Sequence, residues 1–211
     1  MDQDGGPEKE HYFENYDGKK RWMSYWYQIK EVRKTKPNNI LEVGVGNGTV
    51  SNYLRNRGFD VTTADVNGEL DPDYVVSVTD LSEMFDENQF DTVLCAEVLE
   101  HLPFRYFSNS LKELNYVAGN YVILTLPHTG LDFSLKLDFP YFQEKKINFK
   151  IPVPTKHDYD GTHYWTIGKK NSLLEKIKNI VSDVFDIKGT YCIDENPYHR
   201  IFTLKVKDTE P

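Results

Sequence analysis

The pattern of apolar positions first predicts a helix and then a series of short strands separated by helices. From Lys19 to Lys34, aromatic and aliphatic residues recur every three or four positions, as in an amphipathic helix. Pro37 ends this segment. Such a helix packs its apolar face on a core, and it can also form one wall of a pocket.

Short apolar runs alternate with helical stretches after this segment. Strands are predicted at residues 40–43, 61–64, 74–78, 90–96 and 121–126. Helices are predicted at residues 49–57 and about 104–117. This alternation is typical of a parallel sheet with helices on both faces.

The C-terminal part has a different order of elements. A predicted helix at residues 171–184 precedes two apolar runs, at 185–193 and 201–206, with only a short turn between them. Two adjacent strands joined in this way form an antiparallel hairpin. We therefore expect an α/β fold: a Rossmann-like, seven-stranded, mostly parallel sheet that ends in an antiparallel hairpin.

An aromatic-rich stretch interrupts the pattern at about residues 128–168. It shows no clear period, and a loop of this length in a compact domain is usually a lid or a binding segment. The alternative is a small subdomain whose aromatic side chains only pack on the body. We expect an N-terminal helical segment over residues 1–38 and one domain over 39–211 that carries this cap.

Composition restricts the partners and the compartment. The chain has 25 basic and 33 acidic residues, a net charge of −8, which disfavours nucleic acid and anionic membranes as partners. Cys95 and Cys192 have no CxxC spacing, and the polar N-terminus is unlike a secretion signal. No apolar run approaches the ~18 residues needed to span a bilayer. We expect a cytoplasmic protein, and leave its oligomeric state open.

Three glycines at alternate positions mark the first motif. Gly44, Gly46 and Gly48 lie between an apolar run and a predicted helix. Glycine lets the backbone approach a ligand closely, and the helix N-terminus offers amide groups to it. A glycine loop alone does not distinguish a dinucleotide site from a tight turn.

Two details argue against a dinucleotide. The spacing is GxGxG, with Thr49 where a dehydrogenase has its third glycine. Glu42 lies two residues before Gly44, where a carboxylate would repel a pyrophosphate. It would instead suit a ligand with a sulfonium and an ammonium group.

Two further acidic residues follow predicted strands. Asp65 ends the second apolar run, where a carboxylate can accept hydrogen bonds from both ribose hydroxyls. Asp80 follows the third run and precedes Leu81, a pair that could hold an adenine amino group and cover its ring. Taken alone, each aspartate is equally or better explained by a turn or a helix cap.

The fourth strand ends in the segment Glu97-Val98-Leu99-Glu100-His101-Leu102. This segment resembles the fourth-strand motif of small-molecule methyltransferases that use S-adenosylmethionine (SAM), including those of ubiquinone and menaquinone biosynthesis. The resemblance extends over most of the chain from Asn39 onward.

The resemblance implies a class I SAM-dependent methyltransferase. Its acceptor would be a small molecule, and the aromatic cap favours one that is partly apolar or ring-bearing. Glu42 and the first two glycines would hold the methionine end of SAM, Asp65 the ribose, and Asp80 with Leu81 the adenine. The implied cofactor-binding residues are Glu42, Gly44, Gly46, Gly48, Asp65, Asp80, Leu81 and Glu97.

Catalysis requires alignment above all, because methyl transfer is an in-line displacement. A hydroxyl acceptor would also benefit from a base, and histidine is the usual one near neutral pH. His128 follows the fifth strand, and His163 begins a His-Tyr-aromatic-Thr segment similar to one in related enzymes. A lone histidine is more often structural, but if a base exists we expect His128 or His163. His101 and His157 have less positional support.

Other functions remain open from the sequence. The residues show no metal-ligand spacing such as HxxxH or paired CxxC, so we expect no metal site. A protein that binds SAM without turnover, as a sensor or partner subunit, would carry the same motifs. A nucleotide-dependent oxidoreductase is disfavoured by the glycine spacing and Glu42. Aminopropyl transferases share the scaffold, but this sequence shows no match to their acidic polyamine-site motif.

Overall fold

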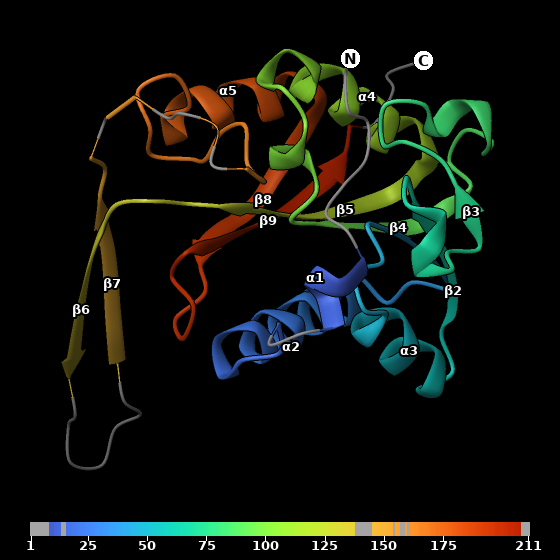
Figure 1. Ribbon diagram of the computed structural model, residues 1–211, viewed down its shortest axis with the longest axis horizontal. Helices are drawn as coiled ribbons and strands as arrows, with labels where there is room; N and C mark the ends of the chain where they lie inside the picture. The colour runs from blue at the N-terminus through green and yellow to red at the C-terminus, as the bar shows by residue number, and fades with distance from the viewer. Residues whose placement is uncertain are drawn as a thin grey trace.

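A seven-stranded sheet forms the centre of the computed structural model, which describes residues 9–13, 16–137, 145–153, 155–156, 159 and 161–207. The strand order is β3-β2-β1-β4-β5-β9-β8 (Figure 1). The strands are β1 (Asn39–Val43), β2 (Asp60–Asp65), β3 (Tyr74–Val75), β4 (Phe90–Ala96), β5 (Ala118–Pro127), β8 (Phe185–Cys192) and β9 (His199–Val206).

Strands β1 to β5 are parallel, whereas β9 runs antiparallel to both of its neighbours, β5 and β8. The expected mostly parallel sheet with a C-terminal antiparallel hairpin is therefore confirmed. The hairpin places β9 between β5 and β8, so the chain returns into the sheet before it ends.

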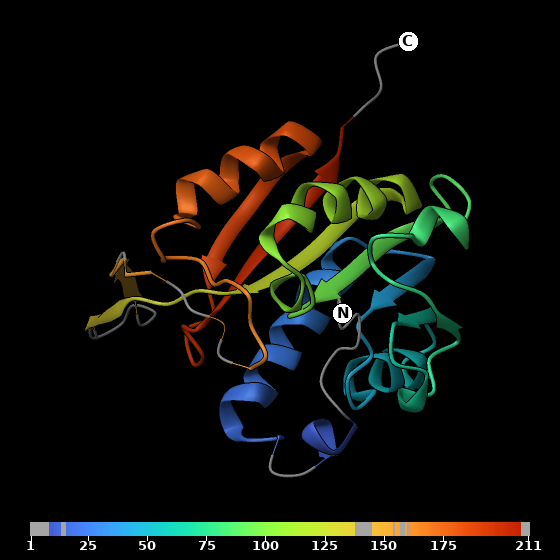
Figure 2. The same ribbon diagram turned by 45° about the horizontal axis from the view of Figure 1, so that its top comes forward.

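Helices cover both faces of this sheet, as Figures 1 and 2 show. Helices α4 and α5 lie on one face, and α1, α2 and α3 lie on the other. The helices are α1 (Lys9–Phe13), α2 (Lys19–Lys34), α3 (Thr49–Asn56), α4 (Phe107–Val117) and α5 (Leu174–Val184); short 3-10 turns are η1 (Gly68–Leu70), η2 (Leu81–Glu83), η3 (Leu99–His101) and η4 (Phe104–Tyr106).

Helix α2 has the bounds that its periodicity predicts, and it packs on the sheet. Val32 and Tyr25 are buried in a core cluster with Ile40 of β1. On the opposite side of the helix, Trp22 and Trp26 are about half exposed. The N-terminal segment thus contributes to the core of the domain.

The cap contains a two-stranded antiparallel ribbon, β6 (Leu131–Leu137) and β7 (Lys145–Ile151). Figure 1 shows this ribbon extending away from the central sheet. The cap aromatics Phe139, Tyr141 and Phe142, and His157, lie outside the described residues.

The end of the cap returns to the body before α5. Ile167 forms a β-bridge with His128, and the buried Trp165 donates a hydrogen bond from Nε1 to the carbonyl of Leu102, 3.1 Å away. Trp165 also packs edge-on against Phe107 of α4. These contacts hold the segment around residue 163 against the sheet edge that carries the site.

Strand β3 is shorter than its apolar run predicts. Pairing with β2 ends at Val75, because the chain then turns, with the amide of Asp80 bonded to the carbonyl of Ser77. The Ser77 and Thr79 hydroxyls also lie 2.8 Å apart across this turn. The sheet edge at β3 therefore presents residues 76–78, several positions earlier than expected.

None of the helices in the described part of the chain is long and apolar enough to cross a membrane.

Candidate active site

A cavity of about 410 Å³ lies at the carboxyl ends of β1, β2 and β4. Open α/β sheets bind ligands at this edge. Of the residues that the sequence singled out, the cavity is lined by Glu42, Gly44, Gly46, Asp65, Glu97 and His163.

The glycine loop between β1 and α3 needs its glycines for conformation and space. Gly44, Gly46 and Gly48 have φ values of +86°, +54° and +72°, a region that side chains disfavour. A Cβ on Gly44 would lie only 2.3 Å from Cγ2 of Val98. The loop therefore packs directly against the segment that follows β4.

Asp65 ties the end of β2 to this loop. One carboxylate oxygen accepts a hydrogen bond from the amide of Val45, and the other accepts one from the amide of Asn67, both at 2.8 Å. Burial raises the pKa of Asp65, and these amides oppose that shift. The carboxylate is thus held at the cavity wall in one orientation.

Glu42 is almost completely buried, and burial raises its pKa to about 8. The hydrogen bond from Ser51 works in the opposite direction. Among the described residues, Oε2 of Glu42 has no hydrogen-bond partner. A cationic group of a ligand could supply the missing partner and ionise this carboxyl.

Glu97 follows β4 with a φ of +56°, and burial raises its pKa to about 7. Its Oε2 lies 3.3 Å from Nε2 of His199. Burial, reinforced by the Arg21 charge, lowers the pKa of His199 to about 3, so this imidazole is neutral near pH 7. The contact therefore involves an uncharged imidazole and is not an ion pair.

The N-terminal segment closes one side of the cavity. Tyr12, Tyr16 and Arg21 all line it. The Tyr12 ring lies 3.5 Å from the position of a Cβ on Gly46, and the Arg21 guanidinium stacks 4.3 Å from the Tyr16 ring centre. Burial raises the pKa of Tyr16 to about 12, which keeps its phenol neutral.

Three expected cofactor residues do not line the cavity. Asp80 is exposed, and Leu81 is buried in the hydrophobic core. Both follow the turn that shortens β3, and residues 76–78 occupy the cavity wall there. Gly48 caps the start of α3 between two lining residues.

The two candidate bases lie in different surroundings. His128 does not line the cavity; its Nδ1 accepts a hydrogen bond of 2.9 Å from Nε of Arg200. Burial and the Arg200 and Lys150 charges lower the pKa of His128 to about 3. His163 lines the cavity, and its ring centre is 5.0 Å from that of His101.

Sequence reasoning missed several lining residues. His199 begins β9, and no local motif distinguishes it from other strand residues. Tyr12, Tyr16 and Arg21 come from the N-terminal segment, for which the only signal was that its helix could form a pocket wall. Their positions depend on packing between distant segments.

Comparison with protein families decides the class. A model described as a methyltransferase domain matches residues 20–142. The chain belongs to this methyltransferase family. A ubiquinone biosynthesis O-methyltransferase of Rickettsia bellii is 25% identical over 165 residues, which cover 71% of this chain and 63% of that protein. The match thus spans less than two thirds of that relative.

Solved methyltransferase structures share the fold. The N-methyltransferase NodS of Bradyrhizobium japonicum, in complex with S-adenosylhomocysteine (SAH), superposes with a TM-score of 0.61 at 10% identity, covering 91% of this chain and 90% of that one. The 1,6-didemethyltoxoflavin-N1-methyltransferase of Burkholderia thailandensis superposes with a TM-score of 0.59 at 12% identity, covering 94% and 85%. At these identities the likeness establishes the fold.

Proposed function

We propose that this methyltransferase transfers the methyl group of SAM to a small-molecule acceptor. One observation carries the proposal: Glu42, Asp65 and Glu97 surround a single cavity beside the positive-φ glycine loop. Three carboxyl groups around one cavity suit a cationic ligand and disfavour a pyrophosphate. Turnover is tested by incubation with SAM and a panel of ring-bearing hydroxyl and amine compounds, with SAH formation as the readout.

The cavity supports a specific orientation of SAM. Glu42 and the glycine loop fit the methionine end, and Asp65 fits the ribose hydroxyls. The adenine fits beside Val76 and Val78, which line the cavity, better than beside the sequence-based pair of Asp80 and Leu81. In the reaction the bond from carbon to sulfur breaks, its electron pair stays on sulfur, and the acceptor atom bonds the methyl group.

We take the acceptor end of the cavity to be the part lined by His101, His163 and Tyr198, which supply both rings and polar atoms. One named relative is a ubiquinone biosynthesis O-methyltransferase, and the other is a 1,6-didemethyltoxoflavin-N1-methyltransferase. These relatives favour a ring-bearing small molecule, and the net charge of −8 disfavours a nucleic acid.

The compartment is part of the same proposal. Cys95 and Cys192 are free thiols, and free thiols persist in a reducing compartment. We therefore infer a cytoplasmic location.

Asp65→Asn should lower SAM affinity about 10- to 100-fold. The variant keeps the shape of the side chain but loses the charge, and a hydrogen bond to a charged group contributes about 1.5–3 kcal/mol. Isothermal titration of both proteins with SAM measures the change. Equal affinities would exclude Asp65 as the ribose ligand.

His163→Ala should lower turnover about 100-fold, the usual contribution of a positioned proton acceptor, with SAM affinity nearly unchanged. His128→Ala should instead lower the melting temperature, because it removes the acceptor of the hydrogen bond from Nε of Arg200. Turnover and SAM titrations on both variants separate these effects. Full turnover in His163→Ala would remove this histidine from the reaction.

A further inference from the structure

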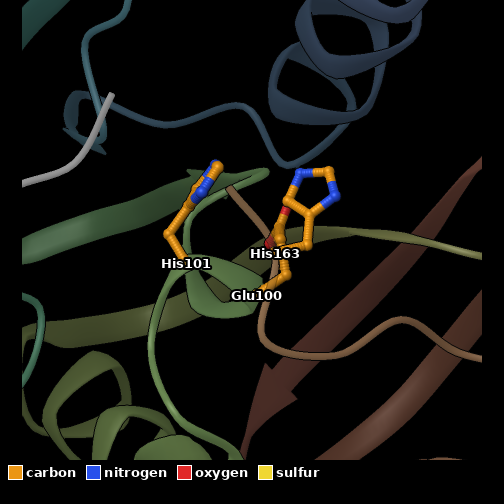
Figure 3. A group of neighbouring side chains, drawn as sticks. All are labelled: Glu100, His101 and His163. Atoms are coloured by element: carbon orange, nitrogen blue, oxygen red, sulfur yellow. The ribbon is translucent and has the colours of Figure 1, made fainter. Parts of the chain in front are cut away.

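Three potential ligands to a metal ion meet at the acceptor end of the cavity. Glu100, His101 and His163 each offer one ligand atom, and these atoms all lie within 4.8 Å of one another. Figure 3 shows the group: Glu100 and His101 come from η3, and His163 comes from the segment that precedes α5. The fold thus joins side chains from two distant parts of the sequence.

Glu100 is the most unusual member of the group. Its side chain is 0% exposed, and neither carboxylate oxygen has a well-aligned donor among the described residues. Its carboxyl instead interacts with that of the nearby buried Glu97. Buried polar groups are almost always paired with complementary groups, so a carboxyl that meets another carboxyl points to a bound group that completes the site.

The surrounding charges are compatible with a bound cation. The Arg21 charge acts on both Glu97 and Glu100, and its guanidinium stacks on the Tyr16 ring. A divalent cation would bring further positive charge to these two buried carboxyls, where water cannot screen it.

His101 has the hydrogen bond of a metal ligand. Its Nδ1 lies 2.8 Å from the carbonyl oxygen of Thr162. A carbonyl can only accept, so Nδ1 must carry the proton and Nε2 keeps its lone pair. Metal-binding histidines are usually oriented by such a bond from the other ring nitrogen.

We propose that Glu100, His101 and His163 bind one divalent cation of the Mn²⁺ to Zn²⁺ type at the acceptor end of the cavity. Two imidazoles and one carboxylate suit these ions better than Mg²⁺ or Ca²⁺. Two atoms that each lie about 2.0–2.2 Å from the same ion are at most ~4.4 Å apart. The three ligand atoms lie within 4.8 Å of one another, so small side-chain rotations would bring them to binding distance.

The ion would act on the acceptor, a consequence that rests on the proposed function. His101 and His163 line the cavity, so the remaining coordination positions face it. A hydroxyl bound there would be oriented and would lose its proton more easily. A histidine that binds the ion through its lone pair cannot also take that proton, so loss of turnover in His163→Ala would then depend on the metal.

Metal binding is tested on tag-free, chelator-treated protein by titration calorimetry with Zn²⁺ and, separately, Mn²⁺. We expect one equivalent per chain, with affinity at least about tenfold weaker in both Glu100→Gln and His163→Asn. Glu175→Gln, an exposed carboxylate on α5, is the matched control and should bind as the wild type does. Circular dichroism shows whether each variant is folded.

Two outcomes would overturn the proposal: no stoichiometric binding of either ion, or equal affinity in the wild type and both cluster variants. If Glu100→Gln fails to fold, His163→Asn decides alone, because His163 is only partly buried. SAM is titrated into the same metal-free samples. SAM binding without metal binding would reject the metal site alone, and metal binding without SAM binding would reject the proposed function alone.

Discussion

Glu42→Gln is expected to weaken SAM binding about 100-fold and to raise the melting temperature of the ligand-free protein at pH 8. The loss of affinity follows from the loss of a buried negative charge against the cationic end of SAM. The gain in stability follows because glutamine fills the same space and has no charge to bury.

The predicted gain in stability depends on pH. Burial raises the pKa of Glu42 from 4.5 to about 8. Stability that depends on the protonated carboxyl is complete below pH 4.5 and is lost as the pH rises toward 8. The melting-temperature advantage of Glu42→Gln should therefore be small at pH 5 and largest at pH 8 and above. Thermal unfolding of both proteins from pH 5 to 9 measures the difference in melting temperature. A difference that does not change with pH would contradict a buried, neutral Glu42 carboxyl.

Gly44→Ala is expected to destabilise the fold and to abolish measurable SAM binding. Its φ of +86° disfavours any side chain by roughly 1–2 kcal/mol. The new Cβ would also lie 2.3 Å from Cγ2 of Val98, so the loop or β4 segment must move. Urea unfolding and SAM titration measure the two effects.

Gly189→Ala is the matched control, because no atom lies within 4 Å of a Cβ at that position in β8. Its free energy of unfolding should stay within about 0.5 kcal/mol of the wild type. The double variant Gly44→Ala/Val98→Ala should recover the part of the loss caused by the clash. Equal stability of the two glycine variants would show that the loop does not require Gly44.

The apolar pattern was sufficient to predict the sheet and one edge of the site. Periods of two and 3.6 residues separate strands from helices, and parallel strands bring their carboxyl ends to the same edge. Glu42, Asp65 and Glu97 lie at or just after the carboxyl ends of such strands, so their meeting at one cavity follows from topology. Their roles in SAM binding stay predictions.

Other residues depend on details that apolar runs do not encode. Asp80 and Leu81 do not line the cavity, because hydrogen bonds around Ser77 end β3 early and residues 76–78 occupy the wall there. His128 follows β5 as predicted, but Arg200 of the neighbouring β9 holds its ring away from the cavity lining. Such contacts between strands distant in sequence decide which way a side chain at a strand end points.

The cluster of Glu100, His101 and His163 shows the same limit. The sequence contains no compact metal motif, which led to the expectation of no metal site. The structure supplies the third side chain from beyond the cap, where the packing of Trp165 and a hydrogen bond from the amide of Tyr164 to the carbonyl of Glu100 hold the segment against η3. Motifs with a fixed residue spacing identify metal sites whose ligands lie close together in the sequence. This group joins side chains from two distant segments.

Calorimetric titration of the purified chain with SAM, SAH and NAD tests the central claim most directly. The proposed orientation of SAM predicts saturable, micromolar binding of SAM and SAH at one site per chain, and no binding of NAD. Binding of NAD with no heat from either sulfur ligand would contradict it.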